Sequence, residues 1–392
     1  MKLRVALAIM LCVSLQTAMA HNNFSIKKAQ SGATVLQNRQ GRVIAYMSDP
    51  IDRSNPGLNW WLSSVERLPA KAMAGIKTTT PASLGFPSRC EPMLTTNWGQ
   101  DAPYSWMCPE PGYLPWAGYR PDVPHCPTGC VATATAQIMK YFGYPLHGTG
   151  TSSVNPEQQE GTTVYTVDHS LATYRWDLML DDYVEGEYTT EQAQAVAELC
   201  YHVGVASLMG YREDASATDN YYAILALQEH FGYATEGVES VDRNNYSESD
   251  WMKMVYTELS EGRPILYEAL GIDLGNYGIY GHSFVIDGYD EAGLVHVNWG
   301  WYGRHNGFYD IALLNPIDLQ FDAYQMMATG IRPKSIVGDV DGDGTVTAAD
   351  ITAIYNYLLS NDTTFLSTSD VDGDGTVTSA DVTLIYNILL GN

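Results

Sequence analysis

A twelve-residue acidic segment occurs twice near the C-terminus of this 392-residue chain, starting at Asp339 and again at Asp370. Each copy places carboxylates at positions 1, 3, 5 and 12 and a glycine at position 6, which is the spacing of a calcium-binding loop. Threonines at positions 7 and 9 add a backbone carbonyl and a hydroxyl or bridging water. The sequence therefore predicts two Ca²⁺ sites. The expected ligands are Asp339, Asp341, Asp343, Thr345, Thr347 and Asp350 in the first loop and Asp370, Asp372, Asp374, Thr376, Thr378 and Asp381 in the second.

The segment that carries the two loops is predicted to form a small all-α domain. Residues 335–392 contain nine Asp but no Glu, Lys or Arg. Each loop is followed by apolar residues at i, i+3, i+4 and i+7, the spacing of a helix with one apolar face. These faces consist of Ile351, Ile354, Tyr355 and Leu358 after the first loop, and of Val382, Ile385, Tyr386 and Leu389 after the second.

The start of the chain has the pattern of a signal peptide. Lys2 and Arg4 precede an apolar stretch, and Ala18-Met19-Ala20 has the small-x-small form of a cleavage site. We expect cleavage after Ala20, so residues 1–20 are absent from a mature protein that is secreted or held at the cell surface. Residues 21–85 then form a short segment that ends in a Thr/Pro/Ser-rich linker, and residues 86–334 form one large domain.

The charge of the chain excludes some classes of partner. It carries 45 acidic and 21 basic residues, which gives a net charge of −24. Nucleic acids and anionic membrane surfaces require Lys and Arg to neutralise their phosphates, so we expect neither as a partner. Beyond the N-terminus no apolar run reaches the ~20 residues of a membrane span.

Cys130 opens a predicted helix. The apolar residues between Cys130 and Phe142 fall on one face at helical spacing, and Gly143 and Pro145 end the pattern. The N-terminus of a helix carries a partial positive charge, which favours a thiolate over a thiol. Cys130 is therefore a candidate nucleophile, and the alternative is a structural cysteine.

His282 is the candidate base for this nucleophile. It follows a Gly-rich loop and precedes a predicted strand over 283–289, and a turn leads to a second strand over 294–298. An antiparallel hairpin brings Asn298 back near His282, in a register that the sequence leaves open. Asn298 would then orient the imidazole, as in a Cys-His-Asn arrangement, and an indole of the following Trp299-Gly300-Trp301 segment would shield that hydrogen bond.

Acyl transfer also requires a hydrogen-bond donor for the oxyanion. Gln100, about thirty residues before Cys130, is the candidate, together with the backbone N–H of Cys130. A surface amide is the alternative for Gln100 alone.

Five cysteines remain after the signal peptide, because Cys12 is lost from the six in the chain. An odd number leaves at least one thiol unpaired. We expect Cys108 and Cys126, which bracket the loop before Cys130, to form a disulfide. Cys90 and Cys200 are then either a weaker pair or two buried thiols.

Three blocks of the large domain resemble the streptopain family of cysteine peptidases. They run from Gly129 to Tyr141, from Gly281 to Gly288 and from His296 to Trp301. The resemblance implies an α+β, papain-like fold of two lobes, one helical and one an antiparallel sheet. It also implies Cys130 as nucleophile, His282 as base, Asn298 as orienting residue, Trp299 as shield and Gln100 as oxyanion donor.

The same resemblance implies a zymogen, with residues 21–85 as a short pro-region and linker. It further implies endopeptidic cleavage of protein substrates, with a preference for an apolar residue two positions before the cut.

The tandem loop–helix pair resembles a type I dockerin, because position 12 is Asp and no helix enters the first loop. Dockerins bind cohesins through positions at the helix starts. The resemblance therefore implies a cohesin partner that contacts Ala348, Ala349, Ser379 and Ala380.

Two alternatives to a peptidase stay open from the sequence. A domain that kept the peptidase shape without activity would be a binding or scaffold protein, but it would not need all four catalytic residues. An acyltransferase or amidase would use the same triad with another acceptor, which the triad itself does not encode.

Overall fold

The computed structural model describes residues 24–29, 31–67, 79–111, 124–155, 164–273, 278–311, 325–342, 344–360 and 366–391. The expected signal peptide and Asp343 lie outside these residues. Among the described helices, none combines the length and apolar character that crossing a membrane requires.

A mixed α+β architecture is confirmed, and its centre is a nine-stranded sheet in which every neighbouring pair is antiparallel. In spatial order its strands are β1 (Phe24–Lys28), β2 (Thr34–Asn38), β3 (Val43–Met47), β10 (Gly307–Tyr309), β9 (Val295–Asn298), β8 (Gly278–Tyr289), β7 (Ile265–Asp273), β11 (Gln325–Thr329) and β6 (Glu239–Asp242).

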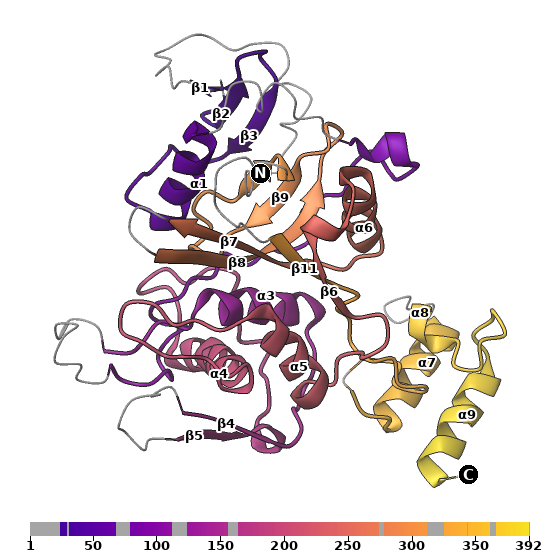
Figure 1. The fold of residues 1–392 in the computed structure, drawn as a ribbon. Coiled ribbons are helices and arrows are strands. Elements are labelled where there is room, and N and C mark those ends of the chain that lie inside the picture. Colours follow the sequence, from indigo (N-terminus) through magenta and orange to yellow (C-terminus); the bar gives the residue numbers. More distant parts are fainter. Residues whose placement is uncertain are drawn as a thin grey trace.

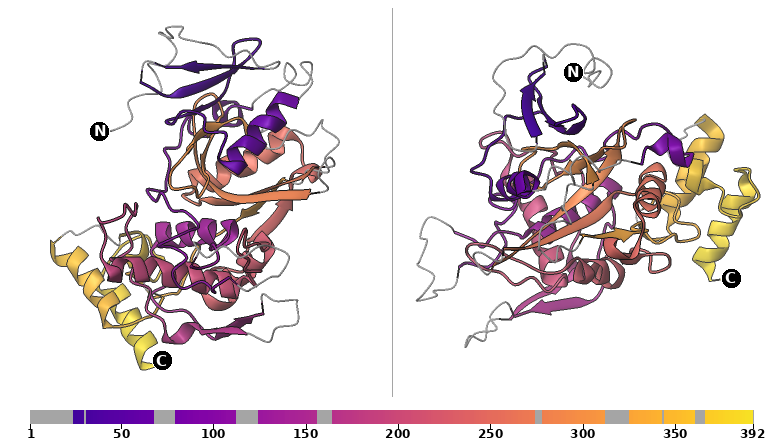
Figure 2. Two further views of the ribbon diagram at one scale, coloured as in Figure 1. Left: turned by 90° about the vertical axis from the view of Figure 1, so that its left-hand side faces the viewer. Right: turned by 45° about the horizontal axis from the view of Figure 1, so that its top comes forward.

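Three helices form a lobe on one side of this sheet (Figure 1), namely α3 (Cys130–Phe142), α4 (Thr190–Ala206) and α5 (Asn220–His230). Beyond them lies a small two-stranded sheet of β4 (Thr151–Val154) and β5 (Tyr165–Asp168). On the other side lie α1 (Pro56–Arg67) and α6 (Glu248–Ser260) (Figure 2). Short 3₁₀ turns complete the described elements, at Pro81–Leu84 (η1), His169–Leu171 (η2) and Arg243–Asn245 (η3).

The strand alternation of β7 and β8 explains the two cores. Leu266 and Val285 face the helical lobe and join its core, whereas Tyr267 and Phe284 face the other way and join the core beneath α1 and α6. Successive side chains of a strand point to opposite faces, so both faces of these strands are apolar. The helical lobe therefore packs on the sheet where α3 meets β8.

The N-terminal segment contains strands that the sequence analysis did not predict. Its strands β1–β3 extend the central sheet, because β3 pairs with β10 through Gly307↔Met47 and Tyr309↔Ala45. Trp61 of α1 is fully buried against the same sheet. Residues 71–78 of the expected linker, which was predicted over 71–85, lie outside the described residues. The backbone carbonyl of Thr79 accepts a 2.6 Å bond from the Tyr256 hydroxyl.

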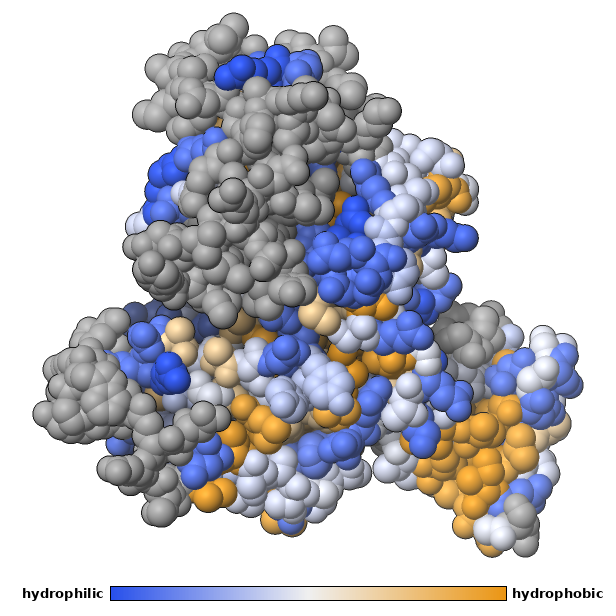
Figure 3. Space-filling model, in the orientation of Figure 1, coloured by the Kyte–Doolittle hydropathy of each residue, from blue (hydrophilic) through white to orange (hydrophobic). Residues whose placement is uncertain are grey.

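The C-terminal domain has the predicted helices, α7 (Ala348–Ser360) and α9 (Ser379–Leu390), with a short α8 (Leu366–Ser369) between them. Only part of each apolar face is buried. Ile351, Ile354, Val382 and Ile385 form the core, whereas a second set forms the apolar surface in Figure 3. This exposed set consists of Tyr355, Leu358, Leu359, Tyr386, Leu389 and Leu390.

The C-terminal domain touches the helical lobe at its first acidic loop. A Cβ placed on Gly344 would lie 3.2 Å from the Tyr144 ring. Tyr144 follows the end of α3, and its hydroxyl donates to the Gly232 carbonyl at 3.2 Å.

Candidate active site

The predicted Cys130 helix is confirmed, and its start depends on a glycine. Gly129 precedes it with φ +87°, and a Cβ there would lie 2.7 Å from the Met209 sulfur and 2.9 Å from the Ser216 carbonyl. Only a glycine fits this backbone and this close approach. Residues 131–139 are all buried, whereas Cys130, the first residue of the helix, is half-buried. The sulfur therefore lies at the edge of a rigid core.

His282 lies on β8 with its ring fixed by a backbone carbonyl. Its Nε2 lies 2.8 Å from the Trp299 carbonyl oxygen. Because a carbonyl can only accept, Nε2 carries the proton and the lone pair of Nδ1 is available as a base.

The structure differs from the expectation that the Asn298 side chain orients this ring. A bulge between Ile286 and Gly288 sets the hairpin register, so Asn298 lies opposite Val285, three residues beyond His282. The Asn298 amide donates to the Thr96 carbonyl at 2.7 Å and accepts from the Gly300 amide at 3.1 Å. Asn298 thus fixes the turn that presents the Trp299 carbonyl.

A buried glutamine that the sequence analysis overlooked completes this network. Gln137, on α3, accepts from the Thr96 hydroxyl at 2.8 Å and donates to the Asn298 side chain at 3.4 Å. It connects the nucleophile helix to the strand end at Asn298. The only signal in the sequence was a polar residue on the apolar face of a predicted helix.

Two indoles cover the imidazole. Trp301 stacks on His282 with ring centroids 4.7 Å apart, and the Trp299 ring lies 6.1 Å from His282 and 5.0 Å from Trp301. Trp299 was expected as the shield, and Trp301 is the ring nearer to His282. The alternation Trp299-Gly300-Trp301 was the signal for this second ring.

The segment that carries Gln100 is held near Cys130 by hydrogen bonds. Its carbonyl accepts from the Thr128 amide at 2.9 Å, two residues before Cys130. The neighbouring Gly99 carbonyl accepts from the Thr133 hydroxyl of α3 at 3.3 Å. Gln100 is half-buried, so the segment that carries it runs along the start of the nucleophile helix.

Burial favours the uncharged forms of the Cys130 thiol and the His282 imidazole. It raises the pKa of Cys130, and the hydrogen bond from the Ser283 backbone amide to the sulfur acts in the opposite direction. Burial also lowers the pKa of His282 to about 4, against the effect of the bond to the Trp299 carbonyl. Both shifts favour a thiol and a neutral imidazole.

The expected disulfide is not formed. Cys108 and Cys126 are both buried free thiols, as is Cys200, and Cys90 and Cys130 are half-buried free thiols. Burial raises the pKa of Cys126 to about 11. Burial likewise raises the pKa of Cys108 well above its usual value, and the Cys108 sulfur bonds the Tyr211 hydroxyl. Both thiols are thus packing groups of the helical lobe.

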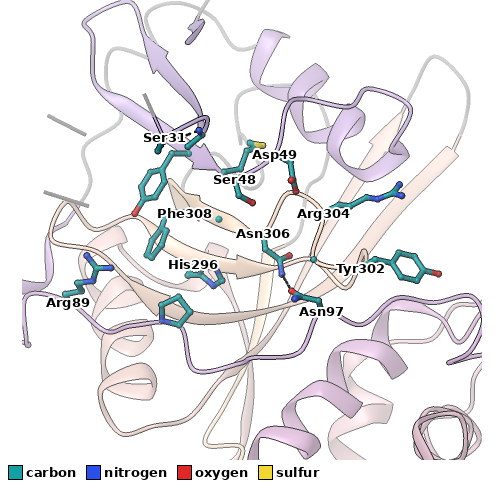
Figure 4. Close-up of a pocket in the computed structure, with 16 residues that line it drawn as sticks. Ser31, Ser48, Asp49, Arg89, Asn97, His296, Tyr302, Arg304, Asn306 and Phe308 are labelled. Atoms are coloured by element: carbon teal, nitrogen blue, oxygen red, sulfur yellow. Dashed lines mark hydrogen bonds between the residues drawn. The ribbon is translucent and has the colours of Figure 1, made fainter. Parts of the chain in front are cut away.

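A cavity of about 580 Å³ lies at the seam between the N-terminal strands and the main domain (Figure 4). Ser48 and Asp49 line it from the N-terminal segment, and His296 and Phe308 line it from the sheet. None of Cys130, His282 or Gln100 belongs to its lining. It is therefore separate from the catalytic residues.

The residues of the two acidic loops fit Ca²⁺. Carboxylate oxygens of Asp339, Asp341 and Asp350 lie within 4.8 Å of one another, as do those of Asp370, Asp372 and Asp374. Oδ1 of Asp370 is buried and has no hydrogen-bond partner among the described residues. A hard cation with several oxygen ligands would satisfy such an atom.

The position-6 glycines and several of the predicted ligands determine the shape of the two loops. Gly344 and Gly375 at position 6 have φ +92° and +89°. The Asp381 carboxylate accepts from the Val371 amide at 2.7 Å and from the Thr378 amide at 2.8 Å. The Thr347 and Thr378 hydroxyls accept from backbone amides at the starts of α7 and α9, at 3.0 Å each, so they act as helix caps.

Comparison with known proteins matches two parts of the chain. Residues 98–309 match the Peptidase C10 family, and residues 337–390 match the dockerin type I domain. The streptopain of Streptococcus pyogenes is 35% identical over 254 residues, which cover 60% of this chain and 60% of that protein. The chain thus spans less than two thirds of the curated streptopains. The thiol protease/hemagglutinin PrtT of Porphyromonas gingivalis is 30% identical over 300 residues, 72% of this chain and 33% of that protein.

Two solved structures share the fold. A fragment of prointerpain A from Prevotella intermedia superposes with a TM-score of 0.69 at 32% identity, and covers 82% of this chain and 98% of its own. Active interpain A, a cysteine protease of the same organism, superposes with a TM-score of 0.56 at 36% identity, and covers 64% of this chain and 98% of its own. These two structures confirm the papain-like fold that was expected for the large domain. This chain belongs to the Peptidase C10 family and carries a type I dockerin domain at its C-terminus.

Proposed function

We propose that this protein is a secreted cysteine endopeptidase in which Cys130 is the nucleophile and His282 is the general base. The observation that carries the proposal is the bond between His282 Nε2 and the Trp299 carbonyl, which leaves Nδ1 as the proton acceptor. The Ser283 amide, next in the chain to His282, bonds the Cys130 sulfur. This bond brings the chain next to His282 up to the Cys130 sulfur, which supports the pairing of His282 and Cys130.

The chemistry follows from this pair. As the Cys130 sulfur attacks the peptide carbonyl, its proton passes to Nδ1 of His282, and the C–N bond then breaks as that proton is given to the leaving amine. Water next attacks the thioester and gives its proton to Nδ1. The C–S bond then breaks and the proton passes from Nδ1 to the sulfur, which releases the acid and restores the thiol. The stacked indoles keep bulk water from the bond that holds the ring.

The oxyanion of each tetrahedral intermediate needs donors. The backbone N–H of Cys130 and the side chain of Gln100 are proposed for this role, because the Thr128–Gln100 backbone bond keeps the Gln100 segment at the start of α3. Asn298 is proposed to hold the Trp299–Gly300 turn in place through its bond from the Gly300 amide.

Residues 24–67 are proposed to act as a pro-region. The fragment of prointerpain A covers more of this chain than the active form does, 82% against 64%. Trp61 of α1 meets Tyr309 edge-on, and Tyr309 meets Trp299. The segment is thus connected by packing to the residue that orients His282. The export signal, with cleavage after Ala20, is part of the same proposal.

The dockerin is proposed to bind two Ca²⁺ and to attach the enzyme to a cohesin. Ala348, Ala349, Ser379 and Ala380 are exposed in the first turns of α7 and α9. The exposed apolar set on the same two helices adds surface for such a partner.

The test is active-site labelling with iodoacetamide under native conditions. Mass mapping should find Cys130 alkylated first, and peptide hydrolysis should fall in proportion to that alkylation. Buried Cys108, Cys126 and Cys200 should react only after unfolding. Full activity after complete alkylation of Cys130 would refute the assignment. Mapping new N-termini in a denatured protein mixture then reports whether cleavage is endopeptidic.

A further inference from the structure

Glu268 is a buried carboxyl on β7 beneath the nucleophile. In the β7–β8 register Glu268 pairs with Ser283, so the two side chains share the sheet face that meets the helical lobe. Glu268 is only 5% exposed, and its Oε2 has no hydrogen-bond partner among the described residues. Burying a carboxylate with an unsatisfied oxygen is costly, so this position calls for an explanation.

Two links connect Glu268 to Cys130. The first passes through β8, because the backbone amide of Ser283, the strand partner of Glu268, bonds the Cys130 sulfur. The second acts through space, because negative charge on Glu268 raises the pKa of Cys130. The Ser283 amide and the Glu268 charge therefore act on the same sulfur in opposite directions.

The start of α5 closes this cluster from the other side. The backbone amide of Asn220 donates to the Glu268 carboxylate. The Asn220 side-chain oxygen accepts from the Ser283 hydroxyl at 2.9 Å, and its Nδ2 is buried with no hydrogen-bond partner among the described residues. Glu268, Ser283 and Asn220 thus form a polar cluster between the sheet and the helical lobe.

Among the residues that the structure describes, few other titratable groups face this cluster. Cys130 faces it from α3, Asp219 from α5, and His282 is the neighbour of Ser283 on β8. The strand on the other side, β11, places the uncharged Met326 opposite Glu268. Burial raises the pKa of Glu268 to about 7, and the Asp219 charge adds to the effect. Glu268 therefore changes charge within the range in which a peptidase works.

We propose that Glu268 is a positioning residue whose negative charge opposes formation of the Cys130 thiolate, so that protonation of Glu268 makes the nucleophile easier to ionise. The proposal rests on the function proposed above for Cys130. No proton passes from Glu268 to the substrate, because the carboxyl acts only through its field and through Ser283.

The test compares the pH dependence of Cys130 alkylation in wild type and in Glu268→Gln. In the wild type, the logarithm of the alkylation rate should rise with pH, with a lag near pH 7 where Glu268 ionises. In Glu268→Gln the lag should vanish and the midpoint should move about one pH unit lower. Glutamine keeps the shape and an oxygen for the Asn220 amide, so a purely structural role would leave the midpoint unchanged.

Glu198→Gln is the matched control. Glu198 lies on α4, and burial raises its pKa as well, but it is not among the charged groups that act on Cys130. Its profile should coincide with that of the wild type. Equal profiles for wild type and Glu268→Gln, or the same shift in Glu198→Gln, would overturn the proposal.

Asp219→Asn keeps the proposal testable if Glu268→Gln does not fold. Asn is as good a helix cap as Asp, so the start of α5 is preserved. Removing the Asp219 charge should move the lag to lower pH, and an unmoved lag would contradict the proposal. If Cys130 were not the nucleophile, peptide hydrolysis would survive alkylation of Cys130 in every variant. That result is distinct from a failure of the Glu268 proposal.

Discussion

Trp61→Ala tests whether the N-terminal segment is part of the packed structure of the enzyme. The Trp61 ring is 0% exposed and meets Tyr309 edge-on, with centroids 5.1 Å apart and planes at 90°. Tyr309 meets Trp299 in the same way, at 5.3 Å and 87°. A change at Trp61 therefore reaches the residue whose carbonyl holds His282.

The expected loss follows from this burial. Replacing a buried Trp by Ala removes its transfer free energy and leaves a cavity, which together cost about 3–5 kcal/mol. The edge-on contact with Tyr309 accounts for about 0.5–1.5 kcal/mol of this. Native proteins are stable by about 5–15 kcal/mol, so the loss is a large part of the total.

The assay is urea unfolding of the full chain in a Cys130→Ala background, which prevents self-cleavage. Trp106→Ala is the control, because Trp106 is 36% exposed and its nearest ring, Tyr188, is 6.4 Å away. We expect a loss below about 1 kcal/mol for that variant. A comparable small loss for Trp61→Ala, or equal losses for both, would refute the packing of this segment on the sheet.

Other regions of the molecule give separate expectations. Burial lowers the pKa of His169 to about 3 and that of His202 to about 4. Both values lie below the ordinary value of about 6.5, so the stability they contribute is complete above that pH and is lost as the pH falls. Thermal unfolding of Cys130→Ala between about pH 4 and 7 measures this, and His169→Gln, unlike exposed His147→Gln, should flatten the profile. Asn298→Ala should lower kcat/KM by about 10²–10⁴-fold, because the turn that presents the Trp299 carbonyl loosens and His282 loses its fixed orientation. An unchanged kcat/KM would show that Asn298 does not position His282. Chelating Ca²⁺ should reduce the helicity of the dockerin and leave peptide hydrolysis unchanged, whereas parallel loss of both would show that Gly344 couples the two domains.

Local patterns predicted the nucleophile helix well, and non-local pairing explains what they missed. The helix from Cys130 to Phe142 is determined by its own periodicity and by the glycines at its ends. The register of the β8–β9 hairpin depends on a bulge at Ile286 that alternation alone does not reveal. With this register the Trp299 carbonyl, and not the Asn298 side chain, bonds the His282 ring.

The N-terminal strands were missed for a related reason. β3 pairs with β10, more than 250 residues further along the chain, and no local pattern indicates such a partner. Burial of Glu268 is likewise a consequence of tertiary packing. In the dockerin the spacing predicted both helices, but it did not separate the buried Ile354 from the exposed neighbouring Tyr355.

The central claim of this account is that Cys130 performs the peptide hydrolysis. Its direct test is kcat/KM of Cys130→Ala beside Cys90→Ala, which removes another half-buried thiol, with circular dichroism to verify the fold of each. The account predicts wild-type hydrolysis for Cys90→Ala and loss to the background rate for Cys130→Ala, because no neighbouring group can replace the sulfur nucleophile. A folded Cys130→Ala enzyme that keeps more than roughly a few per cent of wild-type activity would contradict it, since loss of the nucleophile costs orders of magnitude in rate.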